Sequence, residues 1–372
     1  MKHRPRQILF LYKYLSVGGV ATHLRTLSRK LLENKYQVFL ATCVDDQNKK
    51  IINSLEALGV QIIPIPSTES TIRLAYYFLR KIIQYHKRFN FDLIHSHHRL
   101  THLLGKVLSK LLKIPLLLTV HEFKKDHRLM TRSWGSEKIT VPSRALKKHL
   151  INHYGIDQTC IRVIPNSLGQ EFKVDQQKVT ELEKAMFSDE GAMYVGYIGR
   201  ISLEKGVDRI IESIPLVKEK MPDIRFRIFG EGSLQRKLES RCKELGLDPA
   251  GIFMGVCYDV NEVLYLLDVC VSPSRSESFS IFALEAMRAG KPMIAARVGG
   301  LPEVVIHGET GLLIEAENTQ ALADHIVSLC SDEKKRTEFG KKGRQRFEDA
   351  FTLASFYLNY RKQYTNLLEK NA

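Results

Sequence analysis

Residues 273–303 read PSRSESFSIFALEAMRAGKPMIAARVGGLPE, a polar loop that passes into an apolar run at about Ser280. The apolar run stops at Gly290, and a strand-like run follows from Pro292 to Ala296. Because successive residues of a helix are turned by about 100°, the run forms a helix that is apolar on nearly every face. We therefore expect a buried helix that leads into a strand.

Two glutamates are fixed in this stretch, Glu277 in the loop and Glu285 inside the helix. A carboxylate in an apolar helix is costly without hydrogen-bond donors, so we expect the protein or a ligand to supply donors to Glu285. The first-turn N–H groups of the helix have no intrahelical partner and suit an anion. An alternative interpretation pairs Glu285 with Arg288 and leaves Glu277 as a solvated loop acid.

The composition is that of a globular protein long enough for two domains. The chain has 372 residues, of which 44% are hydrophobic and 26% are charged, and a single hydrophobic core rarely organises so many. No apolar run reaches the roughly 20 residues that cross a bilayer, and the first residues lead directly into a strand-like run, which favours the cytoplasm. The six cysteines form no close pair, so we expect reduced thiols and no zinc site.

The positive charge belongs to the first half of the chain. Residues 1–170 hold 28 Lys and Arg against 10 Asp and Glu, a balance of +18, and the remainder holds 28 against 31, a balance of −3. Such a half suggests an anionic partner, which could be a membrane surface, a phosphorylated acceptor or nucleic acid. The alternative is a basic surface that is merely well solvated.

Strand-like runs alternate with helical stretches, which predicts an α/β fold with parallel sheets and crossover helices. In the first half these runs are 7–12, 36–42, 60–65, 92–95, 115–120, 138–141 and 161–164. In the second half they are 193–198, 224–229, 252–256 and 268–272. The polar stretch 169–192 is interpreted as the connection between the halves, and residues 319–356 as helical. The helices at 73–89 and 103–114 are basic and amphipathic, so they bury an apolar face on the sheet or, alternatively, lie on a membrane surface.

Four histidines crowd near the end of one predicted strand, His95, His97, His98 and His102. Their spacing could suit a metal, but no acidic or cysteine ligand joins them, so no metal site is expected. A fifth histidine, His121, follows the apolar run LLLTV, and open α/β sheets place ligand sites at such carboxyl ends of strands. The alternative for His121 is a histidine that is simply hydrogen-bonded at a strand end.

Two segments, SESFSIFALEAMRAGKPMIAARVGGLPEVV and HGETGLLIEAEN, resemble the nucleotide-sugar site of the retaining glycosyltransferases of family 4, which have the GT-B fold. The resemblance implies two Rossmann-like, doubly wound parallel-sheet domains that face a central cleft. Residues 1–170 would form an N-terminal acceptor-binding domain, and residues 171–351 a C-terminal nucleotide-sugar-binding domain. The last segment, from about 352 to 372, is expected to pack back on the first domain.

The resemblance also assigns roles to residues of this chain. Arg200 and Lys205, in GRISLEKG, would clamp the diphosphate leaving group. Glu285 would accept hydrogen bonds from the ribose hydroxyls, Glu277 would orient the transferred sugar, and His121 would contact that sugar. The candidate catalytic residues are thus His121, Arg200, Lys205 and Glu277. Further contacts to the donor are expected from Gly19, Val256, Phe279, Ser280 and Ile281.

The implied activity is transfer of a sugar, with retention of anomeric configuration, from a nucleotide-sugar donor to a lipid-linked or phosphorylated glycan. A UDP-sugar is preferred over a GDP-sugar, and no metal is expected, because the chain has no Asp-x-Asp triplet. The basic first half suggests a peripheral position on an anionic membrane, at the inner face of the plasma membrane, in surface polysaccharide or lipopolysaccharide biosynthesis.

Two other functions stay open. One is a sugar-nucleotide epimerase, which also uses two facing domains. The other is a non-enzymatic basic binding protein for nucleic acid, but few aromatic residues accompany the charges, and this function leaves residues 273–303 unexplained. No nucleic-acid partner is therefore expected.

Overall fold

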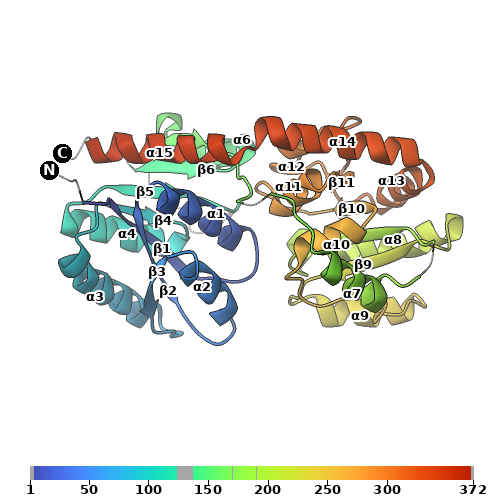
Figure 1. Cartoon of the computed structure of the whole chain (residues 1–372), viewed down its shortest axis with the longest axis horizontal. Coiled ribbons are helices and arrows are strands. Elements are labelled where there is room, and N and C mark those ends of the chain that lie inside the picture. Colours follow the sequence, from blue (N-terminus) through green and yellow to red (C-terminus); the bar gives the residue numbers. More distant parts are fainter. Residues whose placement is uncertain (1–3, 124–136, 170, 190, 370–372) are drawn as a thin grey trace. The chain divides into compact units, whose positions relative to one another are not determined.

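The computed structural model describes residues 4–123, 137–169, 171–189 and 191–369. The chain divides into two compact units. Unit 1 comprises Met1–Gly169 together with Leu353–Ala372, and unit 2 comprises Gln170–Thr352. Each unit contains a parallel sheet, of seven strands in unit 1 and five in unit 2, so the predicted α/β fold with two parallel-sheet domains is confirmed (Figure 1).

The sheet of unit 1 has the strand order β3-β2-β1-β4-β5-β6-β7, and each neighbouring pair is parallel. The chain passes from β1 to β2 on one side and returns to β4 on the other, so the topological switch point lies between β1 and β4. All seven strands lie within two residues of the predicted runs at either end. They are β1 Gln7–Tyr14, β2 Gln37–Cys43, β3 Gln61–Ile65, β4 Leu93–Ser96, β5 Leu116–Thr119, β6 Lys138–Val141 and β7 Ile161–Val163.

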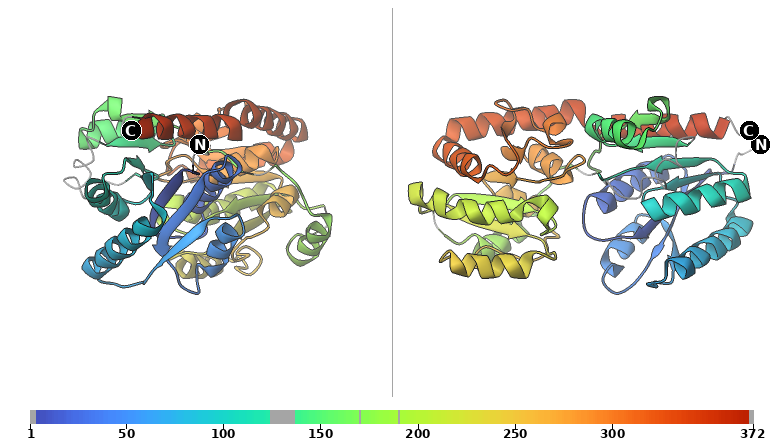
Figure 2. Two further views of the ribbon diagram at one scale, coloured as in Figure 1. Left: turned by 60° about the vertical axis from the view of Figure 1, so that its left-hand side comes forward. Right: turned by 180° about the vertical axis from the view of Figure 1, so that it is seen from behind.

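Helices cover both faces of this sheet, as Figures 1 and 2 show. One face packs against α3 (Thr71–Phe89), α4 (Arg99–Leu112) and α6 (Arg144–Tyr154). The other face packs against α1 (Gly19–Glu33), α2 (Lys49–Glu56) and the C-terminal α15 (Leu353–Glu369). Alternate residues of the central strands point to opposite faces, which is why both layers of the core are apolar. The interpretation of α3 and α4 as helices that pack on the sheet is confirmed.

The sheet of unit 2 has the order β12-β11-β10-β8-β9, and its switch point lies between β8 and β10. Its strands are β8 Tyr194–Ile198, β9 Arg225–Phe229, β10 Val269–Ser272, β11 Met293–Ala296 and β12 Gly311–Ile314. Its helices are α7 Gln176–Met186, α8 Val207–Lys220, α9 Gln235–Glu244, α10 Val260–Leu266, α11 Ile281–Arg288, α12 Leu301–Val304, α13 Thr319–Ser331 and α14 Glu333–Ala350.

Residues 273–303 fold as expected. The helix α11 begins at Ile281, its side chains Phe282–Leu284, Ala286 and Met287 are buried, and β11 follows Gly290. Ser280 precedes the helix with φ +78°, and its hydroxyl accepts a hydrogen bond from Ala283 N at 3.2 Å. This left-handed backbone is unusual for serine and is held by the cap.

Three predicted elements differ from the structure. The run 252–256 makes only one bridge to β9, Ile228 to Phe253, and is no strand, because it lies outside the sheet edge and ends at Gly255 with φ +74°. The stretch 169–192 contains the helix α7, which Asp175 caps through Gln177 N at 3.0 Å. The helical region 319–356 breaks at Asp332, whose side chain accepts a bond from Lys335 N and starts a new helix.

Two expectations from the composition concern membrane spans and disulfides. Across the described residues, every helix is too short or too polar to pass through a lipid bilayer. The six cysteines are free thiols.

Candidate functional site

An ion pair spans the switch point of unit 2. Lys205 lies on the short turn that follows β8, and Glu277 lies on the loop that follows β10. Lys205 Nζ stands 2.5 Å from Glu277 Oε2, with the two side chains 23% and 10% exposed. The structure therefore joins two predicted residues from segments 72 positions apart. Open parallel sheets bind ligands at this position, outside the carboxyl ends of the strands.

Backbone contacts hold the two segments together. Both Arg275 N and Ser276 N donate to Glu204 O, at 2.8 and 3.2 Å. A Cβ at Gly206 would lie 2.0 Å from Pro273 O, and Gly206 also has φ +69°. Glycine is therefore required there, because any side chain would push the two segments apart.

Arg200 lies on the same connection between β8 and α8 as Lys205, and it is exposed. The hydroxyl of Tyr197 donates to Arg200 O at 3.0 Å. Burial raises the pKa of Tyr197, the charge of Glu277 raises it further, and the charge of Arg200 lowers it. In the described part of the chain the Arg200 side chain has neither an ion pair nor a hydrogen bond. Of the two predicted cations, Lys205 is already paired and Arg200 is open to an incoming anion.

Glu285 lies on α11 and is half-buried. Burial raises its pKa from 4.5 to about 7, and Arg288 offsets the effect in part. The guanidinium of Arg288 donates to Asn261 Oδ1 at 2.7 Å, and among the described residues no salt bridge joins Glu285 to Arg288. The alternative interpretation, an ion pair between Glu285 and Arg288, is therefore wrong. Glu285 has no hydrogen-bond partner among the described residues, so its carboxylate is available to donors from a ligand.

Val256 lies on the segment that follows β9 and Gly255. The carbonyl of Gly255 accepts a bond from Gly230 N at 2.7 Å, which fixes this segment beside β9. The next residue, Cys257, has its pKa raised to about 12 by burial and then by the charge of Glu285. Val256 is itself half-buried. The charge of Glu285 thus acts on Cys257, the residue directly after Val256.

The start of α11 offers backbone groups and no reactive side chains. Phe279 is buried and packs edge-on against Phe351, with ring centroids 5.7 Å apart. The hydroxyl of Ser280 caps the helix, and Ile281 is the first helical residue. Phe279, Ser280 and Ile281 can therefore contribute amide N–H groups to an anion, because the first N–H groups of a helix lack intrahelical acceptors.

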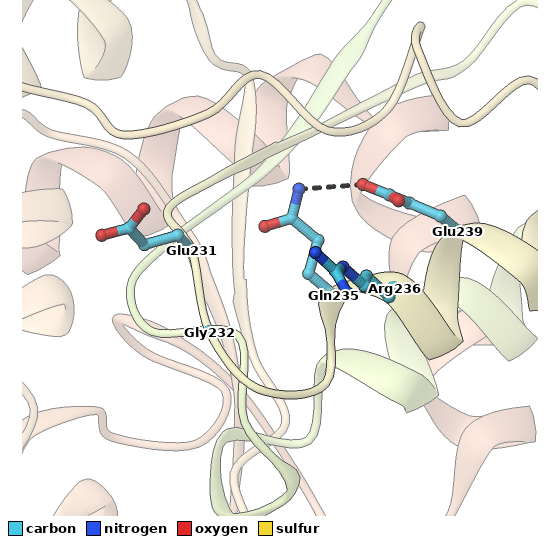
Figure 3. Close-up of a pocket in the computed structure, with 5 residues that line it drawn as sticks. All are labelled: Glu231, Gly232, Gln235, Arg236 and Glu239. Carbon is cyan, nitrogen blue, oxygen red and sulfur yellow. Dashed lines mark hydrogen bonds between the residues drawn. The ribbon is translucent and has the colours of Figure 1, made fainter.

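A surface pocket opens beside the same edge of the sheet (Figure 3). Its lining consists of Glu231, Gly232, Gln235, Arg236 and Glu239. The loop that carries Glu231 is bonded to the Arg200 segment, because Ile201 N donates to Glu231 O at 2.9 Å. Neither Lys205 nor Glu285 lines this pocket. We place the candidate site at the switch point, where charged and buried groups converge, and treat the pocket as its neighbour.

The predicted residues of unit 1 also lie at a switch point. Gly19 is the first residue of α1, directly after Gly18 with φ +148°, and the helix start has no side-chain cap. His121 follows β5, two residues after its last residue, Thr119. One turn into α1, His23 contacts His121 with ring centroids 4.8 Å apart. The amide groups of the helix start and the imidazole of His121 thus share one edge of the unit 1 sheet.

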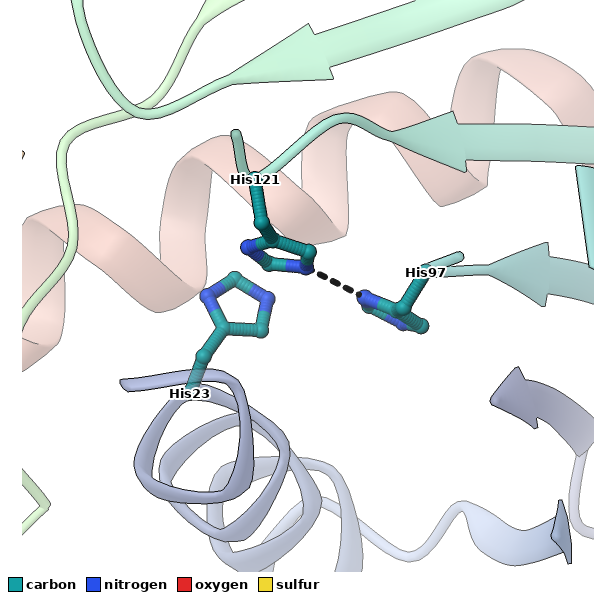
Figure 4. Close-up of side chains that lie close together, drawn as sticks. All are labelled: His23, His97 and His121. Atoms are coloured by element: carbon teal, nitrogen blue, oxygen red, sulfur yellow. Dashed lines mark hydrogen bonds between the residues drawn. The ribbon is translucent and has the colours of Figure 1, made fainter. Parts of the chain in front are cut away.

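Three histidines converge there from three elements, His23, His97 and His121 (Figure 4). One ring nitrogen of each lies within 4.8 Å of the others, close enough to hold a metal ion. His97 Nδ1 and His121 Nε2 are 3.1 Å apart, which is a hydrogen bond, and His23 Nδ1 is bonded to Asn166 Oδ1 at 2.9 Å. Burial lowers the pKa of all three, so they are neutral at pH 7. Of the four histidines singled out as a possible metal cluster, only His97 belongs to this group.

Sequence reasoning missed His23, Asn166 and Tyr197. His23 lies four residues after Gly19 on α1, so helical periodicity puts both on one face and could have indicated it. Asn166 and Tyr197 gave no such signal, because their contacts depend on how distant strands pair.

Two family models match this chain. Residues 17–168 match the model described as Glycosyltransferase Family 4, and residues 178–346 match the model described as Glycosyl transferases group 1. The D-inositol 3-phosphate glycosyltransferase of Pseudarthrobacter chlorophenolicus is 25% identical, over 91% of this chain and 90% of its own length.

Solved structures share the fold of the whole chain. The structure of Anabaena Alr3699/HepE in complex with UDP-glucose has a TM-score of 0.84 and 20% identity, and covers 97% of this chain and 99% of its own. The structure of WaaG, a glycosyltransferase involved in lipopolysaccharide biosynthesis, has a TM-score of 0.76 and 16% identity, with coverage of 96% and 99%.

Proposed function

The chain belongs to the GT-B glycosyltransferases of the family 4 type, and on this premise we propose that unit 2 binds a UDP-sugar whose sugar is transferred, with retention of configuration, to an anionic glycan acceptor. The observation that carries the proposal is the Lys205–Glu277 pair at the switch point, beside the open guanidinium of Arg200. A cation and a carboxylate there match two adjacent parts of the donor, its diphosphate and its hydroxylated sugar.

Leaving-group stabilisation is the main chemical task. The sugar–phosphate bond breaks with negative charge developing on the diphosphate, and preorganised donors that face this charge lower the barrier. Arg200, Lys205 and the amide groups at the start of α11 would supply them. One such donor is typically worth about 3 kcal/mol, so this set would contribute several kcal/mol without a metal ion. We therefore propose a metal-independent reaction.

Glu277 and Glu285 have positioning roles in this proposal. Glu277, which is paired with Lys205 in the free protein, would accept a hydrogen bond from a hydroxyl of the transferred sugar. Glu285 would accept from the ribose hydroxyls, which meets its need for donors, while the backbone at Val256 would hold the base. HepE binds UDP-glucose, which supports UDP over GDP as the nucleotide here.

The second part of the proposal concerns the acceptor and the contact with a membrane. Residues 1–170 carry a balance of +18, and α4 exposes Leu103, Val107 and Leu111 at 40%, 45% and 60%. A basic surface with exposed apolar side chains suits an anionic membrane interface. We propose that the acceptor is lipid-linked or phosphorylated and that the protein acts peripherally at the inner membrane face. A role in polysaccharide or lipopolysaccharide biosynthesis agrees with the process named for WaaG.

A product assay tests this function. The purified protein is incubated with a panel of UDP- and GDP-sugars, with EDTA, with and without membrane lipid extract as acceptor. Transfer predicts release of UDP that depends on the extract and persists in EDTA, and product NMR should show the donor's anomeric configuration. Isomerisation of the donor without nucleotide release would instead assign an epimerase. Loss of all turnover in EDTA would overturn the metal-free proposal.

A further inference from the structure

The three histidines of unit 1 form a hydrogen-bonded chain whose proton positions follow from burial. His23 is 1% exposed and His97 is 3% exposed. Each has one bonded nitrogen, Nδ1, and each leaves Nε2 buried without a partner. A buried N–H without an acceptor costs more than a buried lone pair, so the proton of a neutral imidazole belongs on the bonded nitrogen.

For His23 this rule gives the position of the ring proton directly. Its Nδ1 faces Asn166 Oδ1, which only accepts hydrogen bonds, at 2.9 Å. The proton of His23 is therefore on Nδ1, and Nε2 is a lone pair that points towards the other two rings (Figure 4).

The same rule assigns His97 and, through it, His121. The ring of His97 packs against the rings of Phe10 and His95, with centroid distances of 5.2 and 4.0 Å, and its buried Nε2 atom has no hydrogen-bond partner. The proton of His97 is therefore on Nδ1, from which it donates to His121 Nε2 at 3.1 Å. His121 Nε2 must then accept, so a neutral His121 carries its own proton on Nδ1.

We propose that His97 is a positioning residue that fixes His121 as the Nδ1–H tautomer, so that His121 presents a hydrogen-bond donor to an oxygen of the transferred sugar. The Nδ1 atom lies on the side of the ring away from His97 (Figure 4), and His121 as a whole is half-buried. This nitrogen has no hydrogen-bond partner among the described residues, and it is not fully buried. The role of His97 rests on the proposed function, whereas the tautomer does not.

His23 supports the arrangement from the other side. Its ring packs edge-on against His121 at 4.8 Å and against His97 at 5.4 Å. Because His23 Nε2 and His121 Nε2 are both lone pairs, the single N–H of His97 lies between two acceptors. A proton on either of these nitrogens would face the N–H of His97, so the chain favours one set of tautomers.

Nitrogen-15 NMR of the histidine side chains tests the tautomer directly in the wild-type protein. The expected result is three neutral rings, His23, His97 and His121, each protonated on Nδ1. A His121 ring protonated on Nε2 would overturn the inference. Addition of EDTA should leave the three signals unchanged; signals that move when a metal is removed would show that an ion, rather than His97, orients the ring.

Kinetics test the consequence for the donor. His97→Leu removes the N–H that His121 accepts, so the Nδ1–H signal of His121 should be lost and the KM for the sugar nucleotide should rise about tenfold, with a smaller change in kcat. His97→Asn keeps an N–H near the same position and should restore both the Nδ1–H signal of His121 and the wild-type KM. The matched control is His153→Leu, on α6, which should change neither.

The spectrum and the kinetics test the tautomer and the sugar contact separately. A wrong tautomer in the wild-type spectrum contradicts the inference whatever the function is. A correct tautomer with an unchanged KM in His97→Leu would instead contradict the contact between His121 and the donor, and with it the role assigned to His97.

Discussion

Glu285 has a pKa of about 7 in the free protein, because burial penalises its charged form. At neutral pH the carboxylate is therefore a mixture of charged and neutral forms. A ligand hydroxyl that donates to the carboxylate favours the charged form and lowers this pKa. The proposed ribose contact thus has a consequence that can be measured as proton exchange.

Nucleotide binding at pH 7 should release protons. We expect roughly half a proton per UDP, because a pKa near 7 leaves about half of the Glu285 side chains protonated before binding. Calorimetric titrations in buffers of different ionisation enthalpy measure this number. Glu285→Gln should abolish the release, and at pH 9 the wild type should show none. Binding without proton release at pH 7 would contradict the ribose contact.

The sequence placed single residues well where a local pattern constrained them. Glu285 was recognised as a carboxylate in an apolar helix, and its raised pKa follows from that position. The pairing of Lys205 with Glu277 was not predicted, because it depends on which strands are neighbours at a switch point. For the same reason His23 went unnoticed, since its partners follow β4 and β5.

The turn between β8 and α8 depends on one glycine. Gly206 and Gly246 both have φ +69°, but only Gly206 would bring a Cβ against another segment, 2.0 Å from Pro273 O. A Cβ at Gly246 would have no atom within 4 Å. Alanine at Gly246 therefore introduces backbone strain alone, and alanine at Gly206 introduces backbone strain together with steric overlap.

Gly206→Ala should destabilise unit 2 more than Gly246→Ala. The left-handed backbone alone costs about 1 kcal/mol for alanine, and overlap at Gly206 adds about 1–3 kcal/mol. Urea unfolding followed by circular dichroism compares the two variants. Gly206→Ala should also weaken UDP binding, because it displaces Lys205 from Glu277. Equal losses of stability in both variants would show that the contact with Pro273 is relieved by movement of the loop.

The helices α3 and α4 pack on the sheet of unit 1 and also expose apolar side chains. Their buried faces, such as Leu74 and Phe78 on α3, lie in the core of unit 1. Yet Ile72 and Tyr76 on α3 are 83% and 55% exposed. Amphipathic periodicity identified the helices, but it could not show how wide an apolar stripe the sheet covers.

Vesicle sedimentation tests the exposed stripe of α4. We expect the wild type to pellet with vesicles that contain anionic lipid and to stay in solution with neutral ones, and Leu111→Asp to lose much of this binding. Leu358→Asp on α15, where the leucine is 56% exposed against 60% for Leu111, is the matched control. If both variants pellet like the wild type, α4 makes no contact with the membrane.

At the scale of the whole molecule, the parallel sheets were predictable because alternating strands and helices specify them. The edges of the unit 2 sheet were harder to predict. The run 252–256 has the composition of a strand but gains only one bridge, and the short β12 went unpredicted. Edge segments are set by pairing partners rather than by their own side chains.

The buried histidines of unit 1 make stability depend on pH. Burial lowers the pKa of His23 to about 4 and that of His95, His97, His102 and His121 well below 6.5. Below pH 6.5 the unfolded chain takes up protons that the folded chain refuses, so the free energy of unfolding falls as the pH falls. Glu285 acts in the opposite sense between pH 4.5 and 7, because its folded pKa is raised.

We expect the histidines to dominate, with a loss of several kcal/mol between pH 6.5 and 5, at about 1.4 kcal/mol per pH unit for each histidine. Urea unfolding at a series of pH values measures it. His23→Gln should flatten the curve in this range. A free energy of unfolding that stays constant or increases on acidification would show that these histidines are protonated in the folded protein.

The central claim is that fixed cations at the switch point of unit 2 hold the diphosphate of a nucleotide-sugar without a metal. Titration calorimetry of UDP in EDTA, on the wild type, Arg200→Gln and Lys205→Gln, tests it most directly, with Lys220→Gln on the exposed end of α8 as the control. The account predicts binding by the wild type and the control, weakened about 10- to 100-fold in each site variant, because a hydrogen bond to a charged group contributes about 1.5–3 kcal/mol. Equal affinities in all four proteins, or no binding by the wild type until a divalent metal is added, would contradict it.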